Sequence, residues 1–404
     1  MKKIRVVLLL SILFIIPSMS SAKISDNKEG TEQEKLTIYT YESLFNDPVY
    51  NLEENFASYA NVSQSDVNIV RFGDANEIII KLESEKLDPQ ADVVIGIDNA
   101  LIHLIEDKSQ VLESYTPQNI DSIDQNLIKN LDPDNYLIPY DYGIISLFYQ
   151  NEIINKDHYP VLENFTLDKL LFSDLSSMFI TENPLSSSPG LGFLLWTIAV
   201  YGDQKLDISG ILNRDWRNFW KEINDNITIT ESWGDAFNIF ATEEENKPIM
   251  VSYTTSPAYG YCQWGDNSTS ALLTEENGTF NGWLQIEGIG LVKNAKNPEL
   301  AKFFIDWFLS DPIQTILPEH QWMYPSNTEV SLPRCFEEST IHPDEVNRLN
   351  NLISISELKE NLVYWQDEWE MALVDTSISG FKYEILLFSL IFFAIPIISR
   401  KRKQ

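Results

Sequence analysis

Residues 36–98 contain three short β-branched runs, LTIYTY (36–41), VNIVRF (67–72) and ADVVIGID (91–98), and these runs decide the fold class. The helix-like NLEENFASYA (51–60) separates the first two runs, and a helical pattern from about Asn76 separates the last two. Such alternation is typical of parallel strands joined by helices. The stretch therefore predicts an α/β architecture.

The same alternation returns further along the chain. Strand patterns occur in SSMFITEN (176–183), ITITESW (227–233) and PIMVSYTT (248–255). Helical patterns open after Pro189, run through Trp216 to Trp220, and begin again at Gly234. Two such sets predict two α/β lobes.

Two longer segments are predicted to connect the lobes. YLIPYDYGIISLFYQ (136–150) exceeds an ordinary strand and is expected to bend at Pro139 and Gly143, and GWLQIEGIGLVK (282–293) resembles a return strand pair. More than one crossing predicts a hinge that closes the lobes around a ligand. The expected boundaries are 36–140 and 285–330 for lobe 1, 145–280 for lobe 2, and 331–375 for C-terminal helices, including one at 357–374.

The first 22 residues predict a secretory signal peptide. Three basic residues lie among the first five, an apolar run extends from Val6 to Ile16, and small residues from Ser20 to Ala22 form a cleavage site. A signal anchor is disfavoured because the run is shorter than the roughly 20 residues of a bilayer span. Residues 23–35 are polar and are expected to be a tether.

The other end predicts a single-pass membrane anchor. Residues 383–399 are mostly Ile, Leu and Phe, and the basic cluster Arg400 to Lys403 follows at once. Because basic clusters mark the cytoplasmic side, the tail 400–404 is expected inside and the body, 36–375, on the extracellular face of the cell membrane. Sequons agree with an exported chain and occur at Asn61, Asn164, Asn226, Asn267 and Asn277.

Composition excludes two broad classes. With 44% hydrophobic and 12% aromatic residues, the chain is not globally disordered. With 29 Lys and Arg against 60 Asp and Glu, the net charge is −31, so a nucleic-acid partner is not expected. The only cysteines, Cys262 and Cys335, either pair as one disulfide outside the cell or remain buried thiols, and the sequence leaves both open.

Local signatures of catalysis are missing from the sequence. It has no G-x-S-x-G, H-E-x-x-H, C-x-x-C or G-x-x-x-x-G-K-[ST] string, and its four histidines are far apart. No metal site is expected, because nothing in the sequence resembles a metal knuckle. The missing motifs do not exclude an enzyme, since catalytic groups often converge from distant segments. Aromatic and small polar clusters instead follow the predicted strands, where open α/β sheets bind ligands. These clusters are Tyr39–Ser43, Gly73–Ala75, Ser186–Trp196, Ser232–Gly234, Ser252–Tyr259 and Gln321–Pro325.

These clusters have a functional and a structural interpretation. Trp233, Tyr253, Tyr259 and Trp322 can form an aromatic box for a flat cationic heterocycle, or they can be core residues. Asp74 can supply a counter-charge, or it can be a turn residue.

The string SSPG at 187–190 predicts a helix start. Its Ser187 and Ser188 can bind an anion such as a phosphate with the free N–H groups there, or they can be an ordinary cap.

Seven strings in this chain occur together in a known family. The succession resembles the thiamine-binding proteins of bacterial ABC importers over residues 36–374. The resemblance implies a type II periplasmic-binding-protein fold, thiamine or its phosphate esters as ligand, and an ABC permease with a cytoplasmic ATPase as partner. It also implies no catalysis and no cofactor. The strings are YTYES (39–43), GIDN (96–99), PYDYG (139–143), SSPGLGFLLW (187–196), SWGDAF (232–237), SYTTSPAY (252–259) and WMYP (322–325).

The resemblance also implies a set of ligand-contacting residues. Ser187 and Ser188 are expected near the phosphate or hydroxyethyl end of the ligand. The remaining expected contacts are Asp74, Ala75, Trp233, Tyr253, Thr254, Thr255, Ser256 and Pro257, with Tyr41, Tyr259 and Trp322 placed in the pocket by matching motifs.

The chain departs from the family pattern in three places. Asp74-Ala75 stands where the family usually has an acidic residue and Gly, residues 242–247 look like an expanded surface loop, and the predicted anchor suggests a cell without an outer membrane. Two alternatives remain. One is a receptor for another cationic solute or for ferric ion, although iron binders resemble one another in an adjacent tyrosine pair that this chain lacks. The other is an anchored thiamine-processing enzyme with Cys262 or Cys335 as nucleophile, although neither lies in a matching motif.

Overall fold

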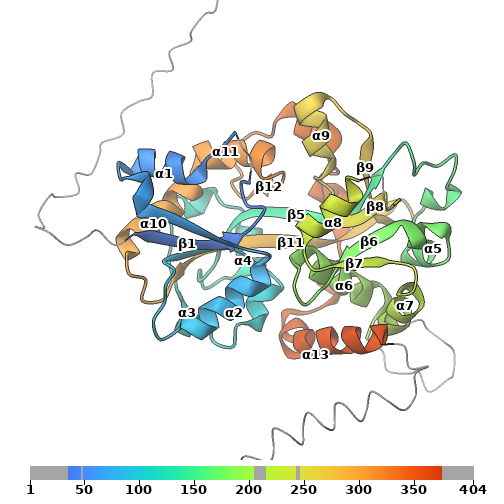
Figure 1. Cartoon of the computed structure of the whole chain (residues 1–404), viewed down its shortest axis with the longest axis horizontal. Helices are drawn as coiled ribbons and strands as arrows, with labels where there is room; N and C mark the ends of the chain where they lie inside the picture. Colours follow the sequence, from blue (N-terminus) through green and yellow to red (C-terminus); the bar gives the residue numbers. More distant parts are fainter. Residues whose placement is uncertain (1–34, 47–48, 204–214, 243–245, 375–404) are drawn as a thin grey trace, which may run out of the picture. The chain divides into compact units, whose positions relative to one another are not determined.

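The computed structural model describes residues 35–46, 49–203, 215–242 and 246–374, which belong to one compact unit of the chain. The first lobe begins with the predicted alternation (Figure 1). Its elements are β1 (Leu36–Tyr41), α1 (Leu52–Ala60), β2 (Val67–Phe72), α2 (Ala75–Glu85) and β3 (Val93–Asp98). Strand β1 pairs in parallel with both β2 and β3.

The second lobe repeats this arrangement. Strand β6 (Phe179–Glu182) pairs in parallel with β7 (Thr228–Thr230) and β8 (Ile249–Tyr253). The helices α6 (Ser188–Tyr201), α7 (Trp216–Ile223) and α8 (Trp233–Phe240) lie between these strands in the sequence. The predicted strand and helix patterns of both lobes are thus confirmed.

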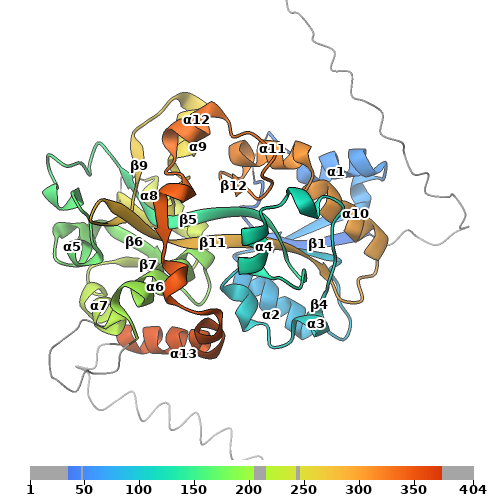
Figure 2. The same cartoon turned by 180° about the vertical axis from the view of Figure 1, so that it is seen from behind.

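Two long antiparallel strands join the lobes. Strands β5 (Ile138–Gln150) and β11 (Thr279–Val292) pair with each other, β11 also pairs with β3, and β5 also pairs with β8. The main path of the sheet is therefore β2-β1-β3-β11-β5-β8-β6-β7. Figures 1 and 2 show β5 and β11 running through the middle of the sheet. The result is one mixed sheet of the two-lobe type.

The predicted return strand pair at 282–293 is wrong. These residues form a single strand, β11, which contains three glycines. The glycines are needed for close packing. A Cβ at Gly282 would lie 2.5 Å from Ile144 Cγ2, and one at Gly290 would lie 2.6 Å from the Tyr136 carbonyl oxygen.

The segment at 136–150 also differs from its prediction in part. It contains one continuous strand, β5, of 13 residues. The pairing with β11 shifts register between Glu287 and Gly288, opposite Asp141 and Pro139, so an irregularity occurs at the predicted proline. Gly143 stays in regular register opposite Gln285.

The C-terminal helix α13 (Ile355–Leu373) confirms the helix predicted at 357–374. It opens with a capping box, in which Ser354 and Glu357 exchange side chain to backbone hydrogen bonds. Its Trp369 packs edge-on against Trp220 of α7, with ring centroids 5.6 Å apart. Helix α13 is therefore part of the folded domain. Figure 2 shows it at the end of the chain's described part.

Several predictions fall on residues that the structure does not describe. The signal peptide, most of the tether and the anchor at 383–399 lie outside the described residues, as do residues 243–245 of the predicted expanded loop. Within the described ranges, no helix has both the length and the apolar character required to cross a bilayer. The five sequon asparagines are described and are all exposed.

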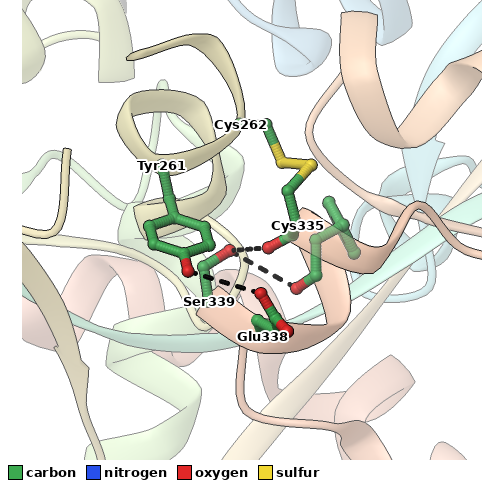
Figure 3. The surroundings of a disulfide bond; sticks show 6 residues. Tyr261, Cys262, Cys335, Glu338 and Ser339 are labelled. Carbon is green, nitrogen blue, oxygen red and sulfur yellow. Dashed lines mark hydrogen bonds between the residues drawn. A yellow bond between two sulfur atoms is a disulfide. The ribbon is translucent and has the colours of Figure 1, made fainter. Parts of the chain in front are cut away.

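Of the two cysteine states left open by the sequence, the structure has the disulfide. Cys262 in α9 (Pro257–Trp264) bonds Cys335 in α12 (Arg334–Ser339), with their Cα atoms 5.2 Å apart (Figure 3). Beside the disulfide, Tyr261 donates its hydroxyl to Glu338, at 3.3 Å. The two helices are thus held together although 73 residues separate the cysteines.

We expect the double variant C262S/C335S to be less stable than the unmodified chain. A cross-link that closes a loop of this length limits the unfolded ensemble, so its loss lowers the free energy of unfolding by about 2–4 kcal/mol. Urea unfolding followed by tryptophan fluorescence measures the change. The unmodified chain with a reducing agent is the matched comparison, and equal midpoints with and without the disulfide would contradict the prediction.

Candidate ligand-binding site

A cavity of about 520 Å³ lies at the strand ends of both lobes. Its volume is within the range of about 300–1,000 Å³ for small-molecule pockets. The strands of each lobe are parallel, so their carboxyl ends meet at one edge and bring the following residues together. Nine predicted site residues line the cavity: Tyr41, Asp74, Ala75, Ser188, Trp233, Tyr253, Ser256, Tyr259 and Trp322.

The first aromatic wall comes from α8. Trp233 stacks on Phe237, with ring centroids 5.1 Å apart and an interplanar angle of 15°. The indole N–H of Trp233 donates to the Ser252 hydroxyl at 2.9 Å, and that hydroxyl is 2.7 Å from the Ser256 hydroxyl. These bonds fix the orientation of the ring, which leaves an aromatic face for a flat ligand.

The second aromatic wall comes from α9 and the segment before β12 (Tyr324–Pro325). Tyr259 packs edge-on against Trp264 and against Trp322, with centroids 5.2 Å apart in each pair. Tyr259 is 42% exposed and Trp264 is 68% exposed, which leaves much of both rings available for contact. The Cys262–Cys335 disulfide therefore holds a helix that lines the cavity.

Asp74 lies between the lobes and is the N-cap of α2. Its Oδ1 accepts the N–H of Ala75 at 2.7 Å and, from the second lobe, the N–H of Ser188 at 3.1 Å. Burial raises the pKa of Asp74 to about 6, although both hydrogen bonds act to lower it. One carboxylate thus contacts the first residues of two helices, α2 and α6.

A close contact at Gly190 places the start of α6 beside Asp74. A Cβ on Gly190 would lie 2.4 Å from the carbonyl oxygen of Glu182, the last residue of β6. Only glycine permits this approach, so the helix begins directly over the end of the strand. Glu182 itself is fully buried, and burial raises its pKa.

The floor of the cavity holds a second carboxylate, Glu287 of β11. Its Oε2 accepts hydroxyl hydrogen bonds from Tyr41, at 2.6 Å, and from Tyr140, and its Oε1 accepts the Gln285 amide at 2.9 Å. Glu287 stands opposite Asp141 of β5 in register. Burial raises the pKa of both carboxyls, so each holds its proton more tightly than usual.

The charge in the cavity is negative. Among the described residues that line it, Asp74 and Glu287 are the acidic side chains, His320 is the only histidine, and Lys and Arg are absent. A site with aromatic faces and uncompensated carboxylates favours a cation.

Four predicted residues do not line the cavity. Ser187 is buried at the N-cap of α6, and Pro257 is the first residue of α9. Thr254 and Thr255 are fully buried, and the Thr254 N–H donates to the Ile144 carbonyl at 2.9 Å.

The sequence analysis missed eight lining residues, which are Asn46, Val49, Phe148, Phe237, Gln263, Trp264, Glu287 and His320. Glu287 lies inside a long apolar strand, Phe237 is one helical turn after Trp233, and His320 ends α11 (Asp311–His320). Phe237 could have been found from its spacing with Trp233 on one helix face. Nothing in the pattern around Glu287 or His320 indicated the cavity. Within the described ranges, no group of three or more His, Cys, Asp or Glu could hold a metal ion.

Known proteins match both the sequence and the structure. A thiamine-binding periplasmic protein of Brucella melitensis is 30% identical over 341 residues, which is 83% of this chain and 91% of the relative. One of Escherichia coli is 28% identical over 84% of this chain and 93% of the relative. A solved periplasmic thiamin binding protein has a TM-score of 0.69 and 27% identity, covering 85% of this chain and 98% of that one.

The family model of bacterial extracellular solute-binding proteins matches residues 65–315. This range begins just before β2 and ends within α11, so it includes the second lobe, the part of the first lobe from β2 onward, and the long strands that join the lobes. The relatives are binding proteins, and this chain is a binding protein and not an enzyme. The two lobes, the cavity at their strand ends and these matches together show that the chain belongs to the bacterial extracellular solute-binding protein family.

Proposed function

We propose that this chain is the thiamine receptor of an ABC importer. It captures thiamine outside the cell and delivers it to a permease whose cytoplasmic ATPase drives import, and it needs no cofactor. Relatives named as thiamine-binding proteins support the proposal. The observation that carries it is a cavity lined by the Trp233 ring and by the buried carboxylates of Asp74 and Glu287.

The chemistry of thiamine matches these features. Thiamine joins a positively charged thiazolium ring to an aminopyrimidine. Aromatic faces such as that of Trp233 attract the cation and stack on flat rings, and buried carboxylates supply the counter-charge. The hydrogen-bonding groups of Glu287 and Ser256 suit the polar edge of the pyrimidine. We assign ligand contact to the lining residues named above.

The receptor is proposed to stay at the cell surface through residues 383–399. Their apolar sequence and the basic residues after them support a single-pass anchor with the body outside. A receptor for another cationic solute, such as a polyamine, is the main alternative. Flat aromatic walls favour a heterocycle over a flexible polyamine, because ring stacking needs two planar partners.

Thiamine is expected to bind with a dissociation constant of about 1 μM or below, about 8 kcal/mol. Calorimetric titration of the purified, ligand-free chain measures it, with spermidine as the cationic control. Tighter binding of spermidine than of thiamine would reject the proposal in favour of a polyamine receptor. Protein that is folded by circular dichroism yet gives no heat with thiamine would also reject it.

Replacing Trp233 with Ala is expected to weaken thiamine binding about tenfold, because one ring face for stacking and cation attraction is lost. The matched control is Y59A, which removes an exposed ring that does not line the cavity. Titration of both variants tests the assignment. Equal affinities for W233A and the unmodified chain would remove Trp233 from the site.

Thiamine affinity is expected to rise with pH. A bound cation favours ionised carboxylates, so binding releases protons from groups whose pKa is raised in the empty protein, as for Asp74 with its pKa of about 6. Affinity should therefore be full above about pH 7 and fall about tenfold as the pH is lowered to about 5. Calorimetric titration with thiamine, repeated in buffers that differ in ionisation enthalpy, gives the number of protons released on binding. A pH-independent affinity with no proton release would contradict this prediction.

A further inference from the structure

We propose that Gln321 is a positioning residue for the binding of the ligand's cation. Through Tyr41 it keeps the negative charge of the buried Glu287–Asp141 pair on Glu287, the member that lines the cavity. The inference rests on the proposed function, because it concerns how the same cavity holds a positively charged ligand. Gln321 lies directly after α11 and also lines the cavity.

The orientation of the Gln321 side chain amide is fixed by a backbone group. Its Oε1 accepts the Phe45 N–H at 2.8 Å, and its Nε2 donates to the Tyr41 hydroxyl at 2.7 Å. A backbone N–H can only donate, so the carbonyl end of the amide faces Phe45 and the NH₂ end faces Tyr41. The amide therefore has one orientation.

This orientation decides where the Tyr41 hydroxyl hydrogen points. The hydroxyl oxygen accepts from Gln321, so its single hydrogen is available for another acceptor, and Glu287 Oε2 lies 2.6 Å away. Tyr140, whose hydroxyl oxygen is 2.9 Å from that of Tyr41, donates to the same Glu287 oxygen. The Gln285 amide donates to Glu287 Oε1 at 2.9 Å. Both oxygens of Glu287 therefore accept hydrogen bonds.

Asp141, the other acid of the pair, has no such donors. It stands opposite Glu287 in register, and both of its carboxyl oxygens are buried without a hydrogen-bond partner among the described residues. Hydrogen bonds to a carboxylate favour its ionised form, whereas burial without donors favours the protonated acid. The pair therefore holds its charge on Glu287 and its proton on Asp141. Of the two, Glu287 lines the cavity and can contact a cation there.

The remaining groups around Glu287 are acidic or neutral. Burial raises the pKa of Glu287, and Asp98 and Asp74 of the first lobe add to this rise. Tyr253 of β8 is a further titratable neighbour. Among the described residues that line the cavity, His320 is the only histidine, and Lys and Arg are absent. Without a basic partner, Glu287 depends on its hydroxyl and amide donors to remain ionised.

The test is calorimetric titration of Q321L with thiamine at pH 8 and pH 6, compared with the unmodified full-length chain at the same pH. Q321L removes the donor to Tyr41 and keeps a side chain of similar size. Glu287 should then ionise at a higher pH. We therefore expect Q321L to bind within about twofold of the unmodified chain at pH 8 and about fivefold more weakly at pH 6. Q321M, which also has no N–H donor in its side chain, covers the case in which Q321L does not fold.

A merely structural role of Gln321 would give a different result. Trp322 follows Gln321 with a left-handed backbone, at a φ of 61°, and a disturbance there would lower affinity by the same factor at both pH values. Y41F separates the two roles further, because it removes the hydroxyl through which Gln321 acts. In the Y41F background, Q321L should cause no further loss at pH 6, since two residues that act through one contact are not additive.

Q125L is the matched control. Gln125 is exposed, donates to the Ile120 and Ile123 carbonyls and does not line the cavity, so its variant should bind thiamine like the unmodified chain at both pH values. The inference would be overturned by unchanged affinity of Q321L at pH 6, by equal losses at pH 6 and pH 8, or by the same loss with and without the Tyr41 hydroxyl. Each of these results would leave the thiamine receptor intact. Failure of folded, unmodified protein to bind thiamine would reject the proposed function itself.

Discussion

The antiparallel pairing of β5 with β11 is the contact on which the rest of the structure depends, because it continues the hydrogen bonding of the sheet from one lobe into the other. Each of these strands also pairs with a strand of one lobe, β11 with β3 and β5 with β8. The parallel strands of both lobes therefore end at the same cavity. The pairing also places Glu287 opposite Asp141, so two carboxyls are buried together at the floor.

Buried acids without a basic partner are costly for the empty protein, since desolvation disfavours their charged forms. In this cavity hydrogen bonds reduce the cost. The hydroxyls of Tyr41 and Tyr140 donate to Glu287, and backbone N–H groups at two helix N-termini donate to Asp74. A cationic ligand would compensate the remaining charge. The same electrostatics connects the proposed preference for a cation with the expected pH dependence of binding.

The aromatic walls depend on contacts outside the cavity. Trp233 is oriented by Ser252, and Tyr259 belongs to a helix that a disulfide joins to α12. One wall is therefore held by a hydrogen bond within the second lobe, whereas the other is held by a covalent link across 73 residues. Because ring stacking requires accurate orientation, these supporting contacts matter as much for binding as the ring faces themselves.

The sequence by itself determined the two α/β lobes, because hydrophobic periodicity is a local property. Its motifs, through their resemblance to a known family, also indicated nine of the residues that line the cavity. It misjudged β11 as a strand pair, although its glycines pack closely against Ile144 and Tyr136 within one continuous strand, and it missed Glu287 inside that strand. Only the tertiary structure decided that Asp74 reaches Ser188. The two residues are 114 positions apart, and only the packing of one lobe against the other brings the carboxylate to the second helix.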